Sequence, residues 1–156
     1  KPEAFELQAQ AARAAGLHVA LRSSMPDDLA GVDMLVVDAI GEMGVWFRAA
    51  DLVFMGFSLP ASGSPLTGKN PFEALALGAA VIHGPDVTNF AESYEALDAE
   101  GATRQVSSVG ELAHLIANRN GLPAMQVAAE SWLADARRPL ERTKQTILET
   151  LRETET

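Results

Sequence analysis

The stretch Gly68–Glu73, which reads Gly-Lys-Asn-Pro-Phe-Glu, has the residue types best suited to chemistry, and it joins a loop to an alanine- and leucine-rich segment. Asn70 is a favoured N-cap residue, Pro71 suits the first helical position and Glu73 falls at the third, so a helix is predicted to start here. Such a start also suits an anion, because its amide N–H groups lack partners and the helix dipole favours negative charge. The stretch therefore fits either a capping box or a nucleotide site.

Other polar residues could complete an anion site next to this stretch. Arg22 and Ser23 follow a short apolar run, and Lys69 follows a later loop. The candidate phosphate contacts are Arg22, Ser23, Ser58, Gly68 and Lys69. Glu42 and Glu73 suit hydrogen bonds from vicinal hydroxyls, as carboxylates accept from ribose in dinucleotide folds. Together these residue types indicate a site for phosphate plus ribose.

Each of these residues also fits an ordinary structural role. For Glu73 alone, helix capping is favoured over ligand binding by about two to one. Lys69 also fits a solvated surface residue, and Arg22 can pair with the aspartates at positions 27–28. A lone histidine such as His83, at the end of an apolar run, is more often packed or hydrogen-bonded than catalytic. The histidines of the chain are too scattered for a metal motif.

Apolar runs alternate with helix-like segments along the chain. Strands are predicted at Leu17–Arg22, Met34–Asp38, Asp51–Met55, Ala80–His83 and Thr103–Val106, the last as an edge strand. Helices are predicted at Pro2–Ala15, Gly41–Ala50, Pro71–Leu77, Asn89–Ala99, Val109–Asn118 and from Ala124 to the end, with an interruption at Pro139. Asn89 with Glu92, and Ser108 with Glu111, predict two further N-caps.

This alternation predicts the fold class. Near-continuous apolar strands between helices are typical of a parallel sheet covered on both faces. We therefore expect an α/β fold, a doubly wound parallel sheet of about five strands with helices on both faces. In such a sheet the strand-to-helix loops meet at the carboxyl ends of the strands, where ligands bind.

The totals of the sequence bound the class of protein. With 156 residues, 47% hydrophobic and 21% charged, the chain has the composition of a globular domain. A net charge of −9 argues against a nucleic-acid partner, which needs a basic surface. The absence of cysteine excludes disulfides and thiolate metal sites and favours a cytosolic compartment. No run approaches the ~20 apolar residues that span a bilayer, so we expect no membrane span in this chain.

Several segments, in order along most of the chain, resemble the motifs of one enzyme family. They are Val37–Gly44, Ala49–Leu59, Asn70–Ala74, His83–Pro85 and Asn89–Glu92. Together they are similar to the C-terminal domain of 3-deoxy-D-manno-octulosonic acid (Kdo) transferase, which glycosylates lipid A during lipopolysaccharide assembly. The resemblance implies a glycosyltransferase of the two-domain B type (GT-B), whose C-terminal Rossmann-like domain binds the donor CMP-Kdo.

The resemblance also implies roles for particular residues. The family's Gly-Glu-Leu/Met and Asn-Pro-x-Glu segments contact CMP, a role that carries over to Gly41, Glu42, Met43, Asn70, Pro71, Phe72 and Glu73. The parent enzyme would transfer Kdo to a lipid A precursor, without a metal or other cofactor, at the cytoplasmic face of the bacterial inner membrane. We expect its N-terminal acceptor domain, with the catalytic base and the membrane anchor, to be absent from this chain, which would then hold no catalytic residue and be inactive alone.

The expected domains are a donor-binding domain at residues 1–122 and a C-terminal helical extension at residues 123–156. Two departures from the family pattern matter. Phe57 replaces a second glycine before a lengthened loop, Ser58–Lys69, and Asp86–Thr88 stands where a histidine-containing segment is commoner. Two alternatives stay open: half of a sugar-nucleotide epimerase that binds UDP, and an interaction module without a ligand, in which the caps are only caps.

Overall fold

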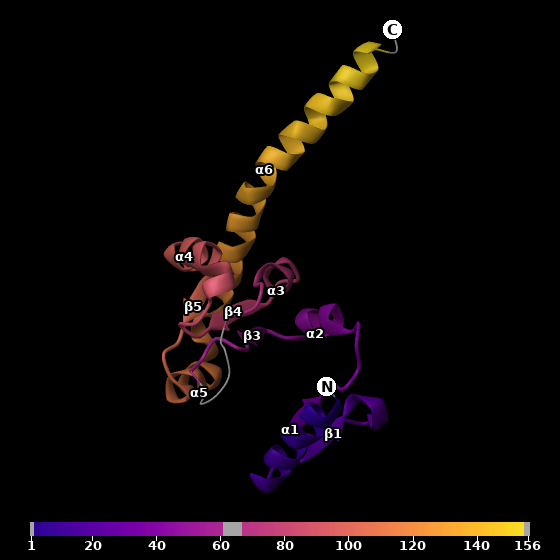
Figure 1. The fold of residues 1–156 in the computed structure, drawn as a ribbon, viewed down its shortest axis with the longest axis vertical. Helices are drawn as coiled ribbons and strands as arrows, with labels where there is room; N and C mark the ends of the chain where they lie inside the picture. Colours follow the sequence, from indigo (N-terminus) through magenta and orange to yellow (C-terminus); the bar gives the residue numbers. More distant parts are fainter. Residues whose placement is uncertain (1, 61–66, 155–156) are drawn as a thin grey trace. The chain divides into compact units, whose positions relative to one another are not determined.

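The computed structural model of the chain describes residues 2–60 and 67–154. The chain divides into two compact units, residues 1–43 and 44–156, and each unit is described by itself (Figure 1). The domain boundary expected at residue 122 lies inside the second unit and stays a prediction.

The first unit packs a helix on a pair of parallel strands. It contains α1 (Pro2–Ala14), β1 (Val19–Leu21), the 3-10 helix η1 (Arg22–Ser24) and β2 (Met34–Val36). The two strands pair in parallel, with Val19 opposite Met34, and α1 contacts both of them. Ala9 of α1 is fully buried, which places this side of the helix against its neighbours. The chain leaves α1 at Gly16, whose φ of +87° favours glycine, as the sequence predicts.

The second unit is built on a three-stranded parallel sheet. Its elements are α2 (Met43–Ala49, beginning at the boundary), β3 (Leu52–Met55), α3 (Phe72–Ala76), β4 (Ala80–His83), η2 (Thr88–Phe90), α4 (Ala91–Ala99), β5 (Thr103–Gln105), α5 (Val109–Ala117), η3 (Arg119–Gly121) and α6 (Leu122–Thr154). The strand order is β3-β4-β5, and every residue of the central β4 is buried. Leu52 lies opposite Ala80, and Val81 lies opposite Thr103.

The core of the second unit is formed by the sheet with α3, α4 and α6. Helices α3 and α6 contact β4, and α4 contacts β5. Buried members of this core include Met55, Leu75, Val81, Tyr94 and Leu97. At its edge the half-buried Phe72 and Trp132 stack, with ring centroids 5.7 Å apart and planes at 18°. The aromatic stack therefore ties α3 to α6.

The predicted α/β class, with parallel strands flanked by helices, is confirmed, but the strands form two sheets instead of one. The described residues contain five strands, all paired in parallel, in one two-stranded and one three-stranded sheet, and helices pack on both sheets. The polar strand β5 lies at the edge of its sheet, as predicted, with Arg104 and Gln105 exposed. The mostly apolar β4 lies in the centre, where its residues are covered, and the hydrogen bonds of His83 offset the burial of its one polar side chain.

One of the two further N-caps is present. Ser108 caps α5, since its hydroxyl accepts a hydrogen bond from the N–H of Glu111 at 3.2 Å. The prediction that Asn89 and Glu92 cap α4 is wrong. The 3-10 helix η2 precedes α4, and the N-cap residue, Phe90, makes no side-chain hydrogen bond. The chain enters α4 from a tighter turn, so Asn89 never reaches the capping position.

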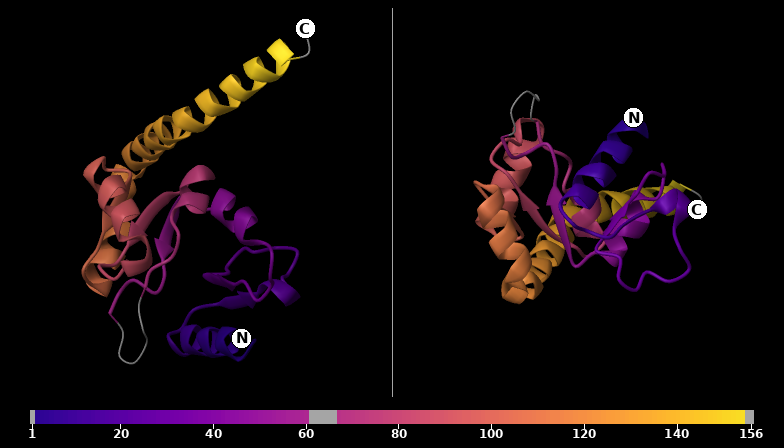
Figure 2. Two further views of the ribbon diagram at one scale, coloured as in Figure 1. Left: turned by 45° about the horizontal axis from the view of Figure 1, so that its top comes forward. Right: turned by 90° about the horizontal axis from the view of Figure 1, so that it is seen from below.

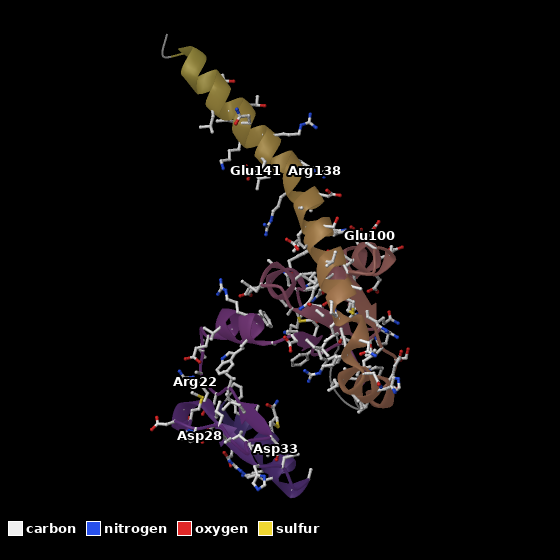
Figure 3. The ribbon with its side chains drawn as sticks, turned by 180° about the vertical axis from the view of Figure 1, so that it is seen from behind. Arg22, Asp28, Asp33, Glu100, Arg138 and Glu141 are labelled. Atoms are coloured by element: carbon white, nitrogen blue, oxygen red, sulfur yellow. The ribbon has the colours of Figure 1, made fainter. Side chains whose placement is uncertain are left out.

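The prediction that Pro139 interrupts the C-terminal helix is also wrong. α6 is one continuous helix of 33 residues, and it continues past the sheet (Figure 2). A proline removes one backbone hydrogen bond and crowds the preceding turn. On either side of it, the ion pairs Arg138–Asp135 (2.8 Å) and Lys144–Glu141 (3.5 Å) join residues three apart and support the exposed helix (Figure 3).

The carboxyl ends of β3 and β4 are joined by a close backbone contact. The buried Ser58 hydroxyl donates to the carbonyl of Met55 and accepts from the N–H of Gly84 at 2.8 Å. The Ser58 carbonyl accepts from the N–H of Asp86 at 2.9 Å. A Cβ on Gly84 would lie 2.1 Å from the Ser58 carbonyl oxygen, so only glycine fits. This contact fixes the loops that follow the two strands.

The end of β4 is also anchored to α4. Buried His83 places Nδ1 2.7 Å from the carbonyl of Gly84 and Nε2 3.1 Å from the Asp98 carboxylate. The ring of Tyr94 lies against His83, with centroids 4.1 Å apart. Burial raises the pKa of Asp98, but hydrogen bonds from His83 and Thr103 outweigh burial and hold this pKa below its usual value. His83 is thus a hydrogen-bonded structural residue, as expected.

Replacing Gly84 by alanine is expected to destabilise the chain, because the added methyl group would overlap the Ser58 carbonyl. We expect the free energy of unfolding, measured by urea titration with circular dichroism, to fall by about 3 kcal/mol or more. Gly56→Ala is the matched control, since nothing lies within 4 Å of a Cβ at Gly56. It is expected to cost less than about 1 kcal/mol, and equal losses for the two variants would contradict the contact.

The lowered pKa of Asp98 predicts how stability depends on pH. A carboxyl group whose pKa is lower in the folded than in the unfolded chain stabilises the fold above its ordinary pKa, and this contribution is lost as the pH falls through the folded-state pKa. The difference in unfolding free energy between wild type and Asp98→Asn should therefore shrink as the pH falls from about 5 through the lowered pKa of Asp98. A difference that stays constant in urea unfolding over this range would refute the role of the ionised carboxylate.

Candidate functional site

Helix α3 leaves the Glu73 carboxylate exposed. Asn70 accepts the N–H of Phe72 on its side-chain oxygen at 2.9 Å, and Pro71, which is buried, takes the N-cap position predicted for Asn70. Asn70 therefore supports the helix start from one residue further back. Within residues 2–60 and 67–154, the Glu73 carboxylate makes no hydrogen bond or ion pair. The capping role considered for Glu73 is thus absent, and its carboxylate is free to accept hydrogen bonds.

Glu73 lies beside a second charged side chain, one that the sequence analysis missed. A Cβ on Gly44, in the first turn of α2, would lie 3.8 Å from Glu73 Oε1 and 3.9 Å from a guanidinium nitrogen of Arg48. The carboxylate and the guanidinium thus flank one glycine, and no ion pair joins them in the described part of the chain. Arg48 follows Gly44 by four residues, a helical spacing visible in the sequence. The approach of Glu73 to Gly44 is visible only in the fold.

In the first unit, two predicted site residues bind each other. Arg22 donates to both carboxylate oxygens of Glu42, from Nε at 2.9 Å and from a terminal nitrogen at 3.0 Å (Figure 3 labels Arg22). The expectation that Arg22 pairs with the aspartates at 27–28 is therefore wrong. Both side chains are about one third exposed, at 37% and 30%. Partly exposed pairs of this kind contribute about 1 kcal/mol or less, so an anion can compete for the arginine.

The neighbouring residues of the first unit are held in a similar way. Ser23 donates its N–H at 2.8 Å and its hydroxyl at 2.5 Å to the Asp38 carboxylate. These hydrogen bonds lower the pKa of Asp38. Gly41 has a φ of +91°, which calls for glycine, and Met43 is exposed. The loop after β2 is thus shaped by Asp38 and Gly41, while the Ser23 hydroxyl is already engaged.

In the second unit, two candidate phosphate contacts serve the fold instead. The Ser58 hydroxyl is buried between Met55 and Gly84. Gly68 donates its N–H to the carbonyl of Phe57 at 2.9 Å, and a Cβ at Gly68 would lie 2.9 Å from the backbone of Val87. Because the hydroxyl and the amide are buried and already bonded, Ser58 and Gly68 leave the set of candidate phosphate contacts.

Lys69 and Phe57 form a pair at the surface of the same loops. The Lys69 ammonium lies over the Phe57 ring, 4.7 Å from its centroid, and both residues are exposed. Phe57 has a φ of 59° and is the one residue other than glycine with positive φ in the described chain. This conformation costs roughly 1–2 kcal/mol, whereas an exposed cation–π contact returns about 0.5–1 kcal/mol. The pair therefore adds no net stability.

The predicted site residues thus fall into distinct groups. Met43, Lys69 and Glu73 are exposed, and their side chains make no hydrogen bond or ion pair in the described residues. Gly41 is also exposed. Those that pack or bond inside the protein are Ser58, Gly68, Pro71 and Phe72. Gly41, Glu42 and Met43 belong to the first unit, and Asn70 to Glu73 belong to the second.

The described residues hold no group of His, Cys, Asp and Glu side chains that could bind a metal ion. None of their helices is long and apolar enough to cross a membrane. A surface hollow of about 530 Å³ lies between the end of α4 and α6, lined by Glu100, Ala128, Ser131, Trp132, Asp135 and Ala136. It includes none of the predicted site residues.

The chain was compared with models of protein families, with curated proteins and with solved structures. No model of a protein family matches the chain. The 3-deoxy-D-manno-octulosonic acid transferase of Bordetella pertussis is 33% identical over 138 residues, which cover 85% of this chain and 31% of that enzyme. The crystal structure of the C-terminal CMP-Kdo binding domain of WaaA from Acinetobacter baumannii is similar with a TM-score of 0.76 and 21% identity, covering 85% of this chain and 69% of that one.

These two similarities support different conclusions. The structural similarity, at 21% identity, establishes the fold. The sequence similarity establishes the relationship and confirms the resemblance carried by the motifs, although the chain spans only about a third of the relative's length, 31%. The chain is thus a homologue of the Kdo transferases, with the α/β fold of a C-terminal domain of this family.

Proposed function

We propose that this chain is the donor-binding part of a glycosyltransferase and that it binds CMP-Kdo. In the parent reaction, Kdo passes from CMP-Kdo to a hydroxyl of a lipid A precursor, a step of lipopolysaccharide biosynthesis at the inner face of the inner membrane. The 33% identity to a Kdo transferase supports this function, as does the likeness to a domain described as CMP-Kdo binding. The acceptor site and the catalytic base are assigned to parts of the enzyme outside this chain.

The donor site is proposed chiefly because the Glu73 carboxylate is exposed and unpaired in the described residues. Glu73 lies on a helix that is firmly anchored. Phe72 stacks on Trp132 and Pro71 is buried, so these two residues act by fixing α3. A free carboxylate on a fixed helix suits the vicinal hydroxyls of a ribose, because both hydroxyls can donate to it. Glu73 is therefore assigned to the ribose of CMP.

The phosphate of the donor is assigned to the positively charged side chains near Glu73 and α3. When Kdo is transferred, negative charge grows on the phosphate of the departing CMP, and fixed cations at that position lower the barrier. Lys69 and Arg48 are exposed cations of the second unit without a carboxylate partner in its described residues. The contributions of Gly41, Glu42 and Met43 to CMP binding stay predictions from the family motif. No observation favours the UDP-binding epimerase half or the ligand-free module.

Replacing Glu73 by alanine is expected to weaken CMP binding about five- to tenfold, the loss of one or two hydrogen bonds to a carboxylate. Isothermal titration calorimetry of the chain with CMP measures this change. Glu95→Ala is the matched control, an exposed glutamate on α4 that should leave the affinity unchanged. Equal dissociation constants for wild type and Glu73→Ala would remove Glu73 from the site.

The base specificity is checked by competition. CMP should displace a fluorescent cytidine nucleotide from the chain at lower concentration than UMP or UDP does, because the proposed donor carries cytosine. If UDP competes better than CMP, the epimerase alternative replaces the present proposal. Failure of every nucleotide to bind a chain that circular dichroism shows to be folded would contradict nucleotide binding by this domain.

A further inference from the structure

Three backbone amides at the carboxyl ends of β3 and β4 are already bonded inside the protein. The N–H of Gly68 is bonded to the Phe57 carbonyl at 2.9 Å, and the N–H groups of Gly84 and Asp86 are bonded to Ser58 at 2.8 and 2.9 Å. Helix α3 has only five residues, which gives it a weak dipole. The amides of Gly68, Gly84 and Asp86 are therefore not available to cradle a phosphate.

An exposed cation, Lys69, follows directly after the bonded amide of Gly68. Lys69 lies immediately before Asn70 and α3, its ammonium is exposed, and in residues 2–60 and 67–154 it forms no ion pair. Its backbone is fixed, because the Lys69 carbonyl accepts from the hydroxyl of Tyr94 at 2.8 Å. On a chain with a net charge of −9, an unpaired cation at this edge is a local attraction for an anion.

Phe57 holds this cation at the cost of backbone strain. Its φ of 59° is a conformation that glycine adopts freely and a bulky residue does not. Phe57 is 58% exposed, so burial does not compensate for the strain. The ring instead lies 4.7 Å from the Lys69 ammonium, and the Phe57 carbonyl is bonded to Gly68. Strain that persists without a gain in stability is characteristic of functional positions.

We propose that Lys69 is the phosphate contact of the donor site and that Phe57 is a positioning residue that holds the Lys69 ammonium for it. This inference rests on the proposed function, because the phosphate is that of the CMP donor. A side-chain cation on an aromatic ring would thus contact the phosphate in place of the bonded amides of Gly68, Gly84 and Asp86. The Phe57 ring restricts the lysine to the region above it, so less side-chain freedom is lost when the phosphate binds.

The test compares CMP with cytidine, which lacks the phosphate. Lys69→Met should raise the dissociation constant for CMP about tenfold and leave that for cytidine within about twofold, measured by calorimetry at low salt. Phe57→Leu, which keeps an apolar side chain but removes the ring, should raise the CMP value about threefold. Arg104→Gln is the matched control, an exposed cation on β5 that should change neither value.

A second variant separates positioning from folding. Phe57→Gly removes the strain, so its thermal unfolding midpoint should rise, while its affinity for CMP falls as in Phe57→Leu. The proposal is overturned if Lys69→Met weakens CMP and cytidine equally, or neither of them. It is also overturned if Arg48→Met alone abolishes the preference for CMP over cytidine.

Inorganic phosphate separates this inference from the function on which it rests. Titration of the wild type should shift the amide resonances of Lys69 and Asn70, and the Lys69→Met variant should show no such shift at Asn70. If CMP does not bind but phosphate gives these shifts, the nucleotide function fails and the anion contact stands. If phosphate shifts neither resonance while CMP binds, the anion contact at Lys69 is wrong and the nucleotide function stands.

Discussion

The contact between Ser58 and Gly84 is the constraint on which the loops of the second unit depend. Because the Ser58 carbonyl occupies the space of a Gly84 side chain, the ends of β3 and β4 approach more closely than two ordinary residues allow. The same approach lets Ser58 bond both Gly84 and Asp86. Two chain segments that leave neighbouring strands are thus locked together before either reaches its helix.

A second layer of contacts extends this constraint to the candidate site. His83 and Asp98 join β4 to α4, and from α4 the Tyr94 hydroxyl reaches the Lys69 carbonyl. Gly68 packs on Val87 in the same layer. Lys69 therefore has a backbone fixed from the core outward, and Asn70 and α3 follow directly from it. A ligand contact on a fixed backbone loses little freedom when the ligand binds.

The basic side chains of the described chain differ in whether an acidic side chain neutralises them. Several basic side chains of the described chain already have acidic partners, such as Arg22 with Glu42 and Arg138 with Asp135. Lys69 and Arg48 are among those without a carboxylate partner in the described residues, and both belong to the second unit. For an acidic protein proposed to bind an anionic sugar nucleotide, such local cations must overcome the unfavourable net charge of −9.

The sequence by itself determined the order and type of the elements and the family. The apolar run of β4 and the glycine that ends α1 are local signals, so they survive without knowledge of the fold. The motifs around Gly41 and Asn70 likewise identified a homologue of Kdo transferase, because a family resemblance is carried by residue types in order.

The tertiary structure decided which groups are free. Arg22 binds Glu42, twenty residues away, and not a nearby aspartate. The amide of Gly68, a candidate for phosphate, is already bonded to Phe57, whereas Glu73, a candidate cap, has no partner in the described residues. The physical reason is the same in each case. Hydrogen bonds and ion pairs go to whichever partner the fold brings within about 3 Å, and that distance is set by packing between segments that are remote in sequence.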